Sequence, residues 1–171
     1  MKKKPETKNG FTLIELLVVI GILAILAALL MPAINTMIKK GEQAQAQADA
    51  KLLASVWMKY FNEYGIWPVQ NELDYAMNGE VVLMLRAYFK TSDPRNPKRI
   101  VFFEPDESAL NSANDFVDPW GNVYKVRFDA TRDGRIVPPG GGIDAVLAPV
   151  IAWSSGPDGQ DATTNDNLTS W

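Results

Sequence analysis

Apolar side chains follow one another almost without interruption from Phe11 to Met31. A run of this length can cross the hydrocarbon core of a membrane as an α-helix, which takes about 20 residues. The run contains a single charged residue, Glu15. A carboxylate inside a membrane segment costs roughly 2.5–3.5 kcal/mol on insertion scales, and such residues usually have a functional partner. The pattern therefore predicts a membrane helix with one functionally important charge.

The helical pattern continues beyond the apolar run. Pro32 lies near the end of the run, but apolar and small residues recur at three- and four-residue spacing as far as Val56. Because a proline can kink a helix without ending it, we expect one helix from Phe11 to about Tyr60. The Ala- and Gln-rich segment 41–51 consists of good helix formers and belongs to this helix.

The remainder of the chain has shorter periodic runs. Apolar positions from Tyr75 to Tyr88 predict a second, shorter helix, and the proline-containing segment 91–99 predicts a loop. Short runs rich in β-branched and aromatic residues predict a small antiparallel sheet, and they cover 99–103, 123–128, 135–137 and 146–153. Four aromatic residues at helical spacing should pack on this sheet: Trp57, Tyr60, Phe61 and Tyr64. The expected fold class is therefore α+β, with a long N-terminal helix packed on a small antiparallel sheet.

Composition and charge narrow the possible functions. The chain has 171 residues with no cysteine and no histidine, and its 17 basic and 20 acidic residues give a net charge of −3. Without cysteine, an extracytoplasmic domain must be held by packing or by a metal. The acidic balance argues against nucleic acid as a partner. The lack of histidine and cysteine, and of a serine nucleophile motif or phosphate-binding loop, argues against an enzyme.

The residues before the apolar run indicate a cleavable leader. Four of the first eight residues are lysine, and the apolar run starts directly after Gly10. A secretory signal is cut after its apolar region, whereas a cut after Gly10 would remove only the leader and leave the helix as an anchor. The new terminus would be the amine of Phe11, and Glu15 would lie one helical turn away on the same face. The alternative is a plain single-pass anchor in which Glu15 has no partner.

This N-terminal segment resembles the class III signal of the type IV pilin superfamily, through the lysine-rich leader, Gly10 and the sequence Phe11-Thr12-Leu13-Ile14-Glu15. The resemblance implies that a prepilin peptidase cuts after Gly10 and methylates the new N-terminus at Phe11. It also implies that Glu15 pairs with the terminal amine of a neighbouring subunit during filament assembly. The α+β fold would then be pilin-like.

The resemblance also predicts the domain organisation and the location. Residues 1–10 would be the cleaved leader, 11–34 the transmembrane and filament-core helix, and 35–171 the extracytoplasmic head. The leader lysines outnumber Lys39 and Lys40 beyond the span, so the positive-inside tendency puts the N-terminus in the cytoplasm. The expected location is the bacterial inner membrane, with a single span and a periplasmic head, and a filament after assembly.

Two segments of the predicted head resemble the major pseudopilin of type II secretion systems. The string DPWGNVY, residues 118–124, fits a type I turn at its start and resembles the motif that leads into the sheet in that family. Its expected role is structural. Gly156-Pro157-Asp158-Gly159 and Leu168-Thr169-Ser170-Trp171 resemble the calcium-binding end of the same family.

The C-terminal segment 154–171 supplies candidate ligands for a calcium ion. Hard cations of this kind take about 6–8 oxygen ligands from carboxylates, amides and backbone carbonyls. The leading carboxylates are those of Asp158 and Asp166, with Asn167 as an amide ligand, and Asp161 and Asn165 are further candidates. Asn167 stands where many members of the family have an aspartate. On composition alone, the segment could instead be an acidic, disordered tail.

The resemblance implies a structural subunit of a type II secretion pseudopilus, which polymerises from the inner membrane to drive protein export. The chain would form a homopolymer and would interact with the prepilin peptidase, the inner-membrane platform of the secretion system and minor pseudopilins. One alternative is a type IV pilin of a surface filament, although the absence of cysteine excludes the disulfide loop common there. A different alternative is a membrane-anchored extracytoplasmic binding domain.

Overall fold

The structure, a computed structural model, describes residues 11–69, 71–88, 93–140, 144–163 and 166–171. It divides into two compact units, one ending at Gly41 and the other comprising Glu42–Trp171. The helix α1 (Leu13–Tyr64) belongs to both. The elements that follow it along the chain are β1 (Tyr75–Ala76), α2 (Gly79–Leu85), the 3₁₀ helix η1 (Glu107–Ala109), β2 (Lys125–Phe128), β3 (Val150–Ser154) and β4 (Leu168–Thr169).

The predicted long helix is confirmed. It continues through Pro32 and extends to Tyr64, slightly beyond the expected end. Gly65 ends it, because this residue adopts a left-handed backbone conformation with φ of 70° while its N–H donates to the Phe61 carbonyl at 2.7 Å. A glycine adopts this conformation without steric cost.

In the N-terminal unit, α1 is apolar on all sides from Leu16 to Met31. Large apolar side chains from Phe11 to Met31 are exposed. A stretch of 18 residues in this helix has a mean hydropathy of 3.0, and none of it is buried within the protein. By length and composition this helix can cross a membrane, and it is the only such helix in the described part of the chain. These exposed residues require a non-aqueous environment or a partner.

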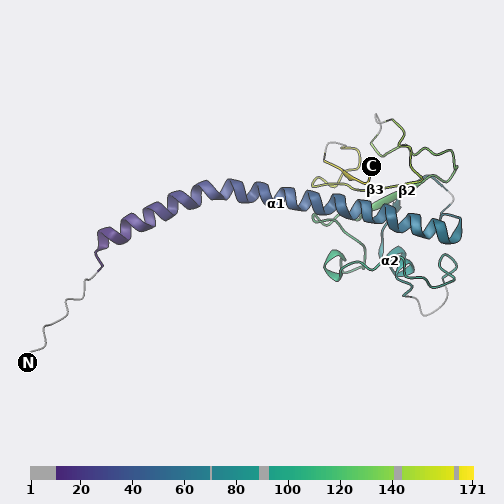
Figure 1. Cartoon of the computed structure of the whole chain (residues 1–171), viewed down its shortest axis with the longest axis horizontal. Coiled ribbons are helices and arrows are strands. Elements are labelled where there is room, and N and C mark those ends of the chain that lie inside the picture. The colour runs from purple at the N-terminus through teal and green to yellow at the C-terminus, as the bar shows by residue number, and fades with distance from the viewer. Residues whose placement is uncertain (1–10, 70, 89–92, 141–143, 164–165) are drawn as a thin grey trace, which may run out of the picture. The chain divides into compact units, whose positions relative to one another are not determined.

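In the second unit, α1 presents one stripe to the core. Its buried residues are Ala46, Ala50, Leu53, Val56, Trp57 and Tyr60, which recur at three- and four-residue spacing. Trp57 makes edge-to-face contacts with Tyr60 and Phe128 at centroid distances of 5.3 and 5.0 Å. Phe61 and Tyr64 are partly buried against the same core. The predicted aromatic core is therefore present, and Figure 1 shows β2, β3 and α2 beside this part of the helix.

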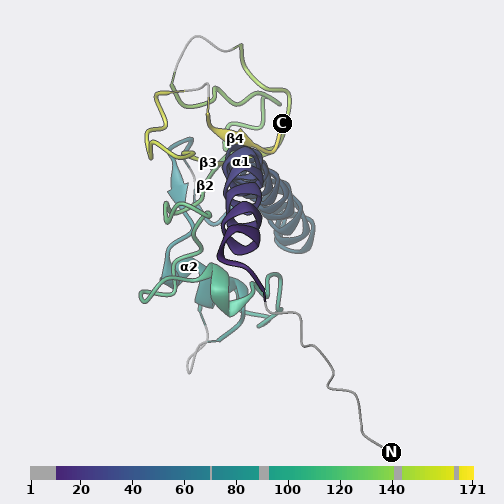
Figure 2. The same ribbon diagram turned by 90° about the vertical axis from the view of Figure 1, so that its left-hand side faces the viewer.

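The sheet has four antiparallel strands in the order β1-β2-β3-β4, and Figure 2 shows β2, β3 and β4 in succession. Val126 and Phe128 of β2 pair with Ala152 and Val150 of β3, and all four belong to the core that contains α1. On the other face, Ile151 and Trp153 form a smaller apolar cluster with Ile136. Strand β3 is therefore buried on both faces, and it leads into the C-terminal segment, whose strand β4 pairs with it.

Two predicted elements have different boundaries. The expected helix from Tyr75 to Tyr88 is divided into β1 and α2, because the Asn78 side chain accepts a hydrogen bond from the Val81 N–H at 3.0 Å and starts the helix there. The expected strand at 99–103 does not form. Instead, the N–H groups of Phe102 and Phe103 donate to the Leu85 carbonyl at the end of α2.

Two further strands also differ from the prediction. The run 135–137 contributes one isolated bridge, between Ile136 and Val146, and no strand. The run 146–153 yields β3, which is shifted toward Ser154. The short strands β1 and β4 were not predicted, because two residues show no alternation of polar and apolar side chains.

A polar contact joins α1 to Tyr124, the residue that precedes β2. The Tyr124 hydroxyl donates to the Asp49 carboxylate at 3.1 Å. Burial raises the pKa of Asp49 above its usual value, although the hydrogen bond from Tyr124 partly opposes this shift. Because the folded pKa is the higher one, ionisation of Asp49 costs stability at every pH above the folded pKa, and this cost disappears as the pH falls below the unfolded value of about 3.8.

We therefore expect Asp49→Asn to raise the thermal midpoint of the full chain in detergent micelles at neutral pH. The amide oxygen still accepts from Tyr124, but no buried charge remains. The gain should shrink in strongly acidic buffer. Asp49→Ala is the control, because it leaves the buried Tyr124 hydroxyl without its acceptor and should lower the midpoint. Circular dichroism measures all three chains, and a lower midpoint for the Asn variant at neutral pH would contradict the assignment.

Candidate functional site

The N-terminus of α1 is closed by a capping box. The Glu15 N–H donates to the Thr12 hydroxyl oxygen at 3.3 Å, and the Glu15 carboxylate accepts hydrogen bonds from the Thr12 N–H at 2.8 Å and the Thr12 hydroxyl at 2.6 Å. This reciprocal arrangement satisfies donors that the first helical turn leaves unpaired. Sequence analysis assigned no role to Thr12, although a threonine three residues before a glutamate at the start of an apolar run is the signal of this motif.

The capping box places the Glu15 carboxylate next to the predicted processing site. Thr12 is the residue that follows Phe11, whose amide nitrogen would become the new terminal amine. Phe11 and Glu15 are both exposed. Gly10, the predicted cleavage residue, lies outside the described residues. The geometry therefore shows where the charge lies at the end of α1, while the cleavage and the pairing with a second subunit stay predictions.

The DPWGNVY segment is an internal polar anchor. Asp118 is buried, and its carboxylate accepts hydrogen bonds from the N–H groups of Trp120 and Asn122 at 3.0 and 2.8 Å. The Gly121 N–H also donates to the Asp118 carbonyl at 2.9 Å, which closes the predicted turn. The expected structural role of this segment agrees with these contacts.

The same anchor extends to the C-terminal segment. The Ser154 hydroxyl, at the end of β3, donates to the Asp118 carboxylate at 2.6 Å. The Asn122 side-chain amide donates to the Gly156 carbonyl at 2.8 Å. The two segments that resemble the pseudopilin are therefore in direct contact, which the sequence did not reveal because they lie more than thirty positions apart.

Asp161 is held by three donors from the sheet and its edge. Its carboxylate accepts from the Trp153 indole N–H at 3.0 Å and from the Ser155 hydroxyl at 2.6 Å, and it forms an ion pair with Lys125. Burial raises the pKa of Asp161, but the hydrogen bonds from Lys125, Ser155 and Trp153 outweigh this effect, so the pKa is lowered overall. Asp161, a predicted cation ligand, thus has protein partners at both carboxylate oxygens.

Asp166 and Asn167 each have a buried oxygen atom without a hydrogen-bond donor in the described part of the chain. These atoms are the Oδ1 of Asp166 and the Oδ1 of Asn167. The Asn167 Nδ2, by contrast, donates to the Asp161 carbonyl at 3.0 Å. A buried carboxylate or amide oxygen without a donor is costly, and a bound cation would satisfy it. The donor set at these two residues therefore fits a hard cation such as calcium.

Asp158, another predicted ligand, has no buried oxygen atom of this kind in the described part of the chain. The Asp158 carboxylate is exposed and accepts from the Gln160 N–H at 2.8 Å, while Asn165 lies outside the described residues. Within the described ranges, no three acidic side chains converge into a metal-binding group. Any cation here would therefore need backbone carbonyls and amide oxygens in addition to carboxylates, as calcium sites commonly use.

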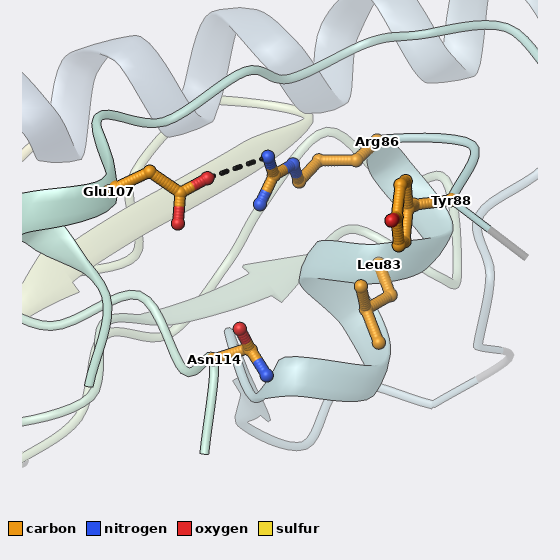
Figure 3. A pocket seen from close by; sticks show the side chains of 5 residues that line it. All are labelled: Leu83, Arg86, Tyr88, Glu107 and Asn114. Carbon is orange, nitrogen blue, oxygen red and sulfur yellow. Dashed lines mark hydrogen bonds and ion pairs between the residues drawn. The ribbon is translucent and has the colours of Figure 1, made fainter. Parts of the chain in front are cut away.

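A pocket of about 480 Å³ lies beside α2 and is shown in Figure 3. An ion pair of 2.9 Å between Arg86 and Glu107 forms one side, and Leu83 and the exposed ring of Tyr88 form another. Asn114 completes the lining. Because Glu107 already binds the guanidinium, the pocket resembles a gap between packed surface elements more than a site for an ionic ligand.

Comparison with protein families gives one match. Residues 7–31 match the model of the prokaryotic N-terminal methylation motif. This match includes Gly10, Phe11 and Glu15, the residues on which the predicted signal was based. No solved structure shows a significant match to the chain.

Curated relatives include surface pilins and a secretion protein. The chain is 35% identical over 80 residues to the fimbrial protein EcpC of Eikenella corrodens, covering 45% of this chain and 52% of that protein. It is 39% identical over 69 residues to the type IV major pilin protein PilE1 of Neisseria gonorrhoeae, covering 40% of this chain and 32% of that pilin. The match therefore spans about half or less of the length of these pilins.

A third relative matches along nearly the whole chain. The type II secretion system core protein G of Escherichia coli K12 is 27% identical over 169 residues, covering 97% of this chain and 92% of that protein. The methylation motif, the α+β fold and these similarities support the type IV pilin superfamily as the family of this chain. The chain is therefore similar to type IV pilins in its N-terminal part and to core protein G along nearly its whole length.

Proposed function

We propose that the chain is the structural subunit of a type II secretion pseudopilus, which polymerises from the inner membrane to drive protein export. The observation that carries this proposal is the extent of the similarity. The match to core protein G includes the head as well as α1, whereas the two pilin matches cover less than half of the chain. The role is structural, without catalysis, as the lack of histidine and cysteine also suggests.

The subunit would be stored in the membrane before assembly. A prepilin peptidase would remove the leader after Gly10 and methylate Phe11, which leaves α1 as a single-pass anchor with the head in the periplasm. The exposed apolar side chains of α1 support this placement, because hydrocarbon removes their contact with water. In the filament, the same side chains would pack against neighbouring copies of α1.

Assembly would use the charge at the helix end. The Glu15 carboxylate lies within the first turn of α1, and the methylated amine of a neighbouring subunit would be its partner. In an apolar filament core, either charge alone would be buried without compensation. Assembly would therefore need both the Glu15 carboxylate and the terminal amine. The inner-membrane platform and minor pseudopilins would be the other partners.

A second candidate is a type IV pilin of a surface filament. Within the matched segments, the identity to the two pilins is 35% and 39%, compared with 27% to core protein G, and this difference favours the pilin. The two candidates share the leader, the anchor and the mode of assembly. They differ in the cellular result, since loss of a pseudopilin stops release of exported proteins and loss of a pilin removes surface filaments.

We also propose that the C-terminal segment binds calcium. The support is the pair of buried oxygen atoms at Asp166 and Asn167 that have no donor within the described residues. From the sequence, Asp158 is the other leading carboxylate, and Asp161 and Asn165 are further candidates. The carbonyls of the loop would complete the coordination. The ion would neutralise the charge of Asp166 and fix the loop beside β3, a role that disulfides can play in proteins with cysteine.

The first prediction concerns processing. Replacing Gly10 with leucine should leave the full-length precursor in the membrane, because the peptidase must fit the backbone at this junction and a side chain obstructs it. Mass spectrometry of the wild-type chain should show an N-terminus at a methylated Phe11. Lys8→Ala serves as a control within the leader and should still be cut. Removal of the leader from the Gly10 variant would contradict the cleavage assignment.

The second prediction separates the charge of Glu15 from its capping role. Glu15→Leu should be processed but should fail to polymerise, and so should Glu15→Gln, although glutamine preserves the capping box. Electron microscopy of filaments and the amount of exported protein in the medium are the two readouts. Wild-type assembly by the Gln variant would contradict the charge pair and leave helix capping as the function of this residue. Loss of surface filaments without loss of export would favour the pilin.

The third prediction tests calcium. Binding to the folded state adds RT ln(1 + [L]/Kd), which is about 2.7 kcal/mol at a hundredfold excess over Kd, so calcium should raise the thermal midpoint of the full chain in micelles and a chelator should reverse this. The Asp158→Ala/Asp166→Ala double variant should lose the shift. Asp144→Ala, which removes an exposed carboxylate outside the C-terminal segment, should retain it. An unchanged wild-type midpoint would contradict the proposal.

A further inference from the structure

The C-terminal segment is fastened to the sheet by an ion pair that the proposed cation does not involve. Lys125 of β2 pairs in register with Trp153 of β3, so their side chains lie on the same face of the sheet. From this face the Lys125 ammonium and the Trp153 indole both reach the Asp161 carboxylate. The exposed fraction is 29% for the Lys125 side chain and 21% for that of Asp161, so the pair is largely removed from solvent.

The backbone of Asp161 connects this ion pair to a candidate ligand. The Asp161 carbonyl accepts from the Asn167 Nδ2 at 3.0 Å. With the nitrogen of the amide engaged in this way, the opposite end of the same side chain is its oxygen, and that oxygen is buried and has no donor in the described chain. The position of Asp161 therefore determines how the Asn167 amide is oriented.

A second contact holds the segment close to Asp166. Gly156 lies against the Asp166 backbone so tightly that a Cβ at position 156 would come within 2.4 Å of the Asp166 carbonyl oxygen. The Gly156 carbonyl is itself fixed by the Asn122 amide. Asp166 and Asn167 are therefore supported from two points of the preceding loop, at Gly156 and at Asp161.

We propose that Lys125 and Asp161 are positioning residues of the cation site: their ion pair fastens the loop to β2 and orients the Asn167 oxygen. This proposal rests on the proposed calcium function. The Lys125 ammonium takes the place that a cation would otherwise occupy at Asp161, so Asp161 is not a ligand. The cation is left with Asp166, Asn167, the exposed carboxylate of Asp158 and backbone carbonyls, and the loop is anchored even without metal.

The Lys125–Asp161 pair would act on the bound ion through a ligand, as the outer-shell contacts of a metal site do. Such contacts orient the ligands of a metal, and their loss typically weakens metal affinity by about 10- to 100-fold. Removing one partner of a partly buried ion pair also leaves the other charge uncompensated, so either single substitution should disturb the loop. Two residues that act only through each other should show non-additive effects when both are replaced.

The experiment uses the full chain in detergent micelles and compares Lys125→Met, Asp161→Asn and the double variant. Calcium affinity is measured by titration with tryptophan fluorescence. Hydrogen exchange of residues 156–171 is measured in the presence of a chelator. Each single variant should raise the Kd for calcium about 10-fold or more and should lose exchange protection in the metal-free loop, with the double variant no worse than either.

Two controls keep the outcome specific. Lys125→Arg retains the positive charge and should stay close to the wild-type chain. Lys98→Met removes a lysine from another ion pair, with Glu63 at 2.5 Å, which joins α1 to the loop after α2. It should change neither calcium affinity nor exchange in 156–171. A general loss of fold would show in the exchange of α1 and is thereby distinguished from a local effect.

Three results would overturn the proposal. If Asp161 were a ligand, Asp161→Asn would weaken binding while Lys125→Met would leave it unchanged or strengthen it, because a competing cation is gone. Wild-type exchange protection in both single variants would refute the anchoring of the loop. If the wild-type chain bound no calcium, the cation site and its positioning would both be wrong, and the metal-free exchange data would still decide whether the ion pair fastens the segment.

Discussion

The structure depends on one helix that meets two different environments. In its N-terminal unit, α1 exposes large apolar side chains on all sides, so no face of it is suited to water. In the second unit the same helix buries only one stripe, ending in Trp57 and Tyr60. The sheet, α2 and the aromatic contacts of the head are all arranged around this stripe. Anchoring and folding are thus performed by a single continuous element.

Away from this core, carboxylates do the work of cross-links. The chain has no cysteine, and in the described part of the segment after β3 the strand that pairs with the sheet, β4, has two residues. Asp118 and Asp161 hold the segment in place of covalent cross-links, because the carboxylate of each accepts hydrogen bonds from several segments. Hydrogen bonds to an ionised acceptor are stronger than those between neutral groups, and the low dielectric constant of the protein interior strengthens them further.

The sequence predicted what is local and missed what is distant. The long helix follows from apolar spacing within its own residues, and the aromatic core follows from four positions at its end. The partner of Asp161 could not be inferred, since Lys125 lies 36 positions earlier and shares no pattern with it. The strands β1 and β4 are defined by their neighbours in the sheet rather than by their own residues. Thr12 is different, because a threonine three residues before Glu15 is a local sequence signal of a capping box.

The capping box at Thr12 changes the energetic status of a subunit that has not yet joined a filament. A carboxylate without any donor would be costly for a free subunit in hydrocarbon. Here Thr12 already donates two hydrogen bonds to Glu15. In the proposed assembly, the incoming amine would therefore meet a carboxylate that already has two donors, and it would join or replace them. Until that step, the contacts within the first turn of α1 would lower the cost of keeping the Glu15 carboxylate away from water.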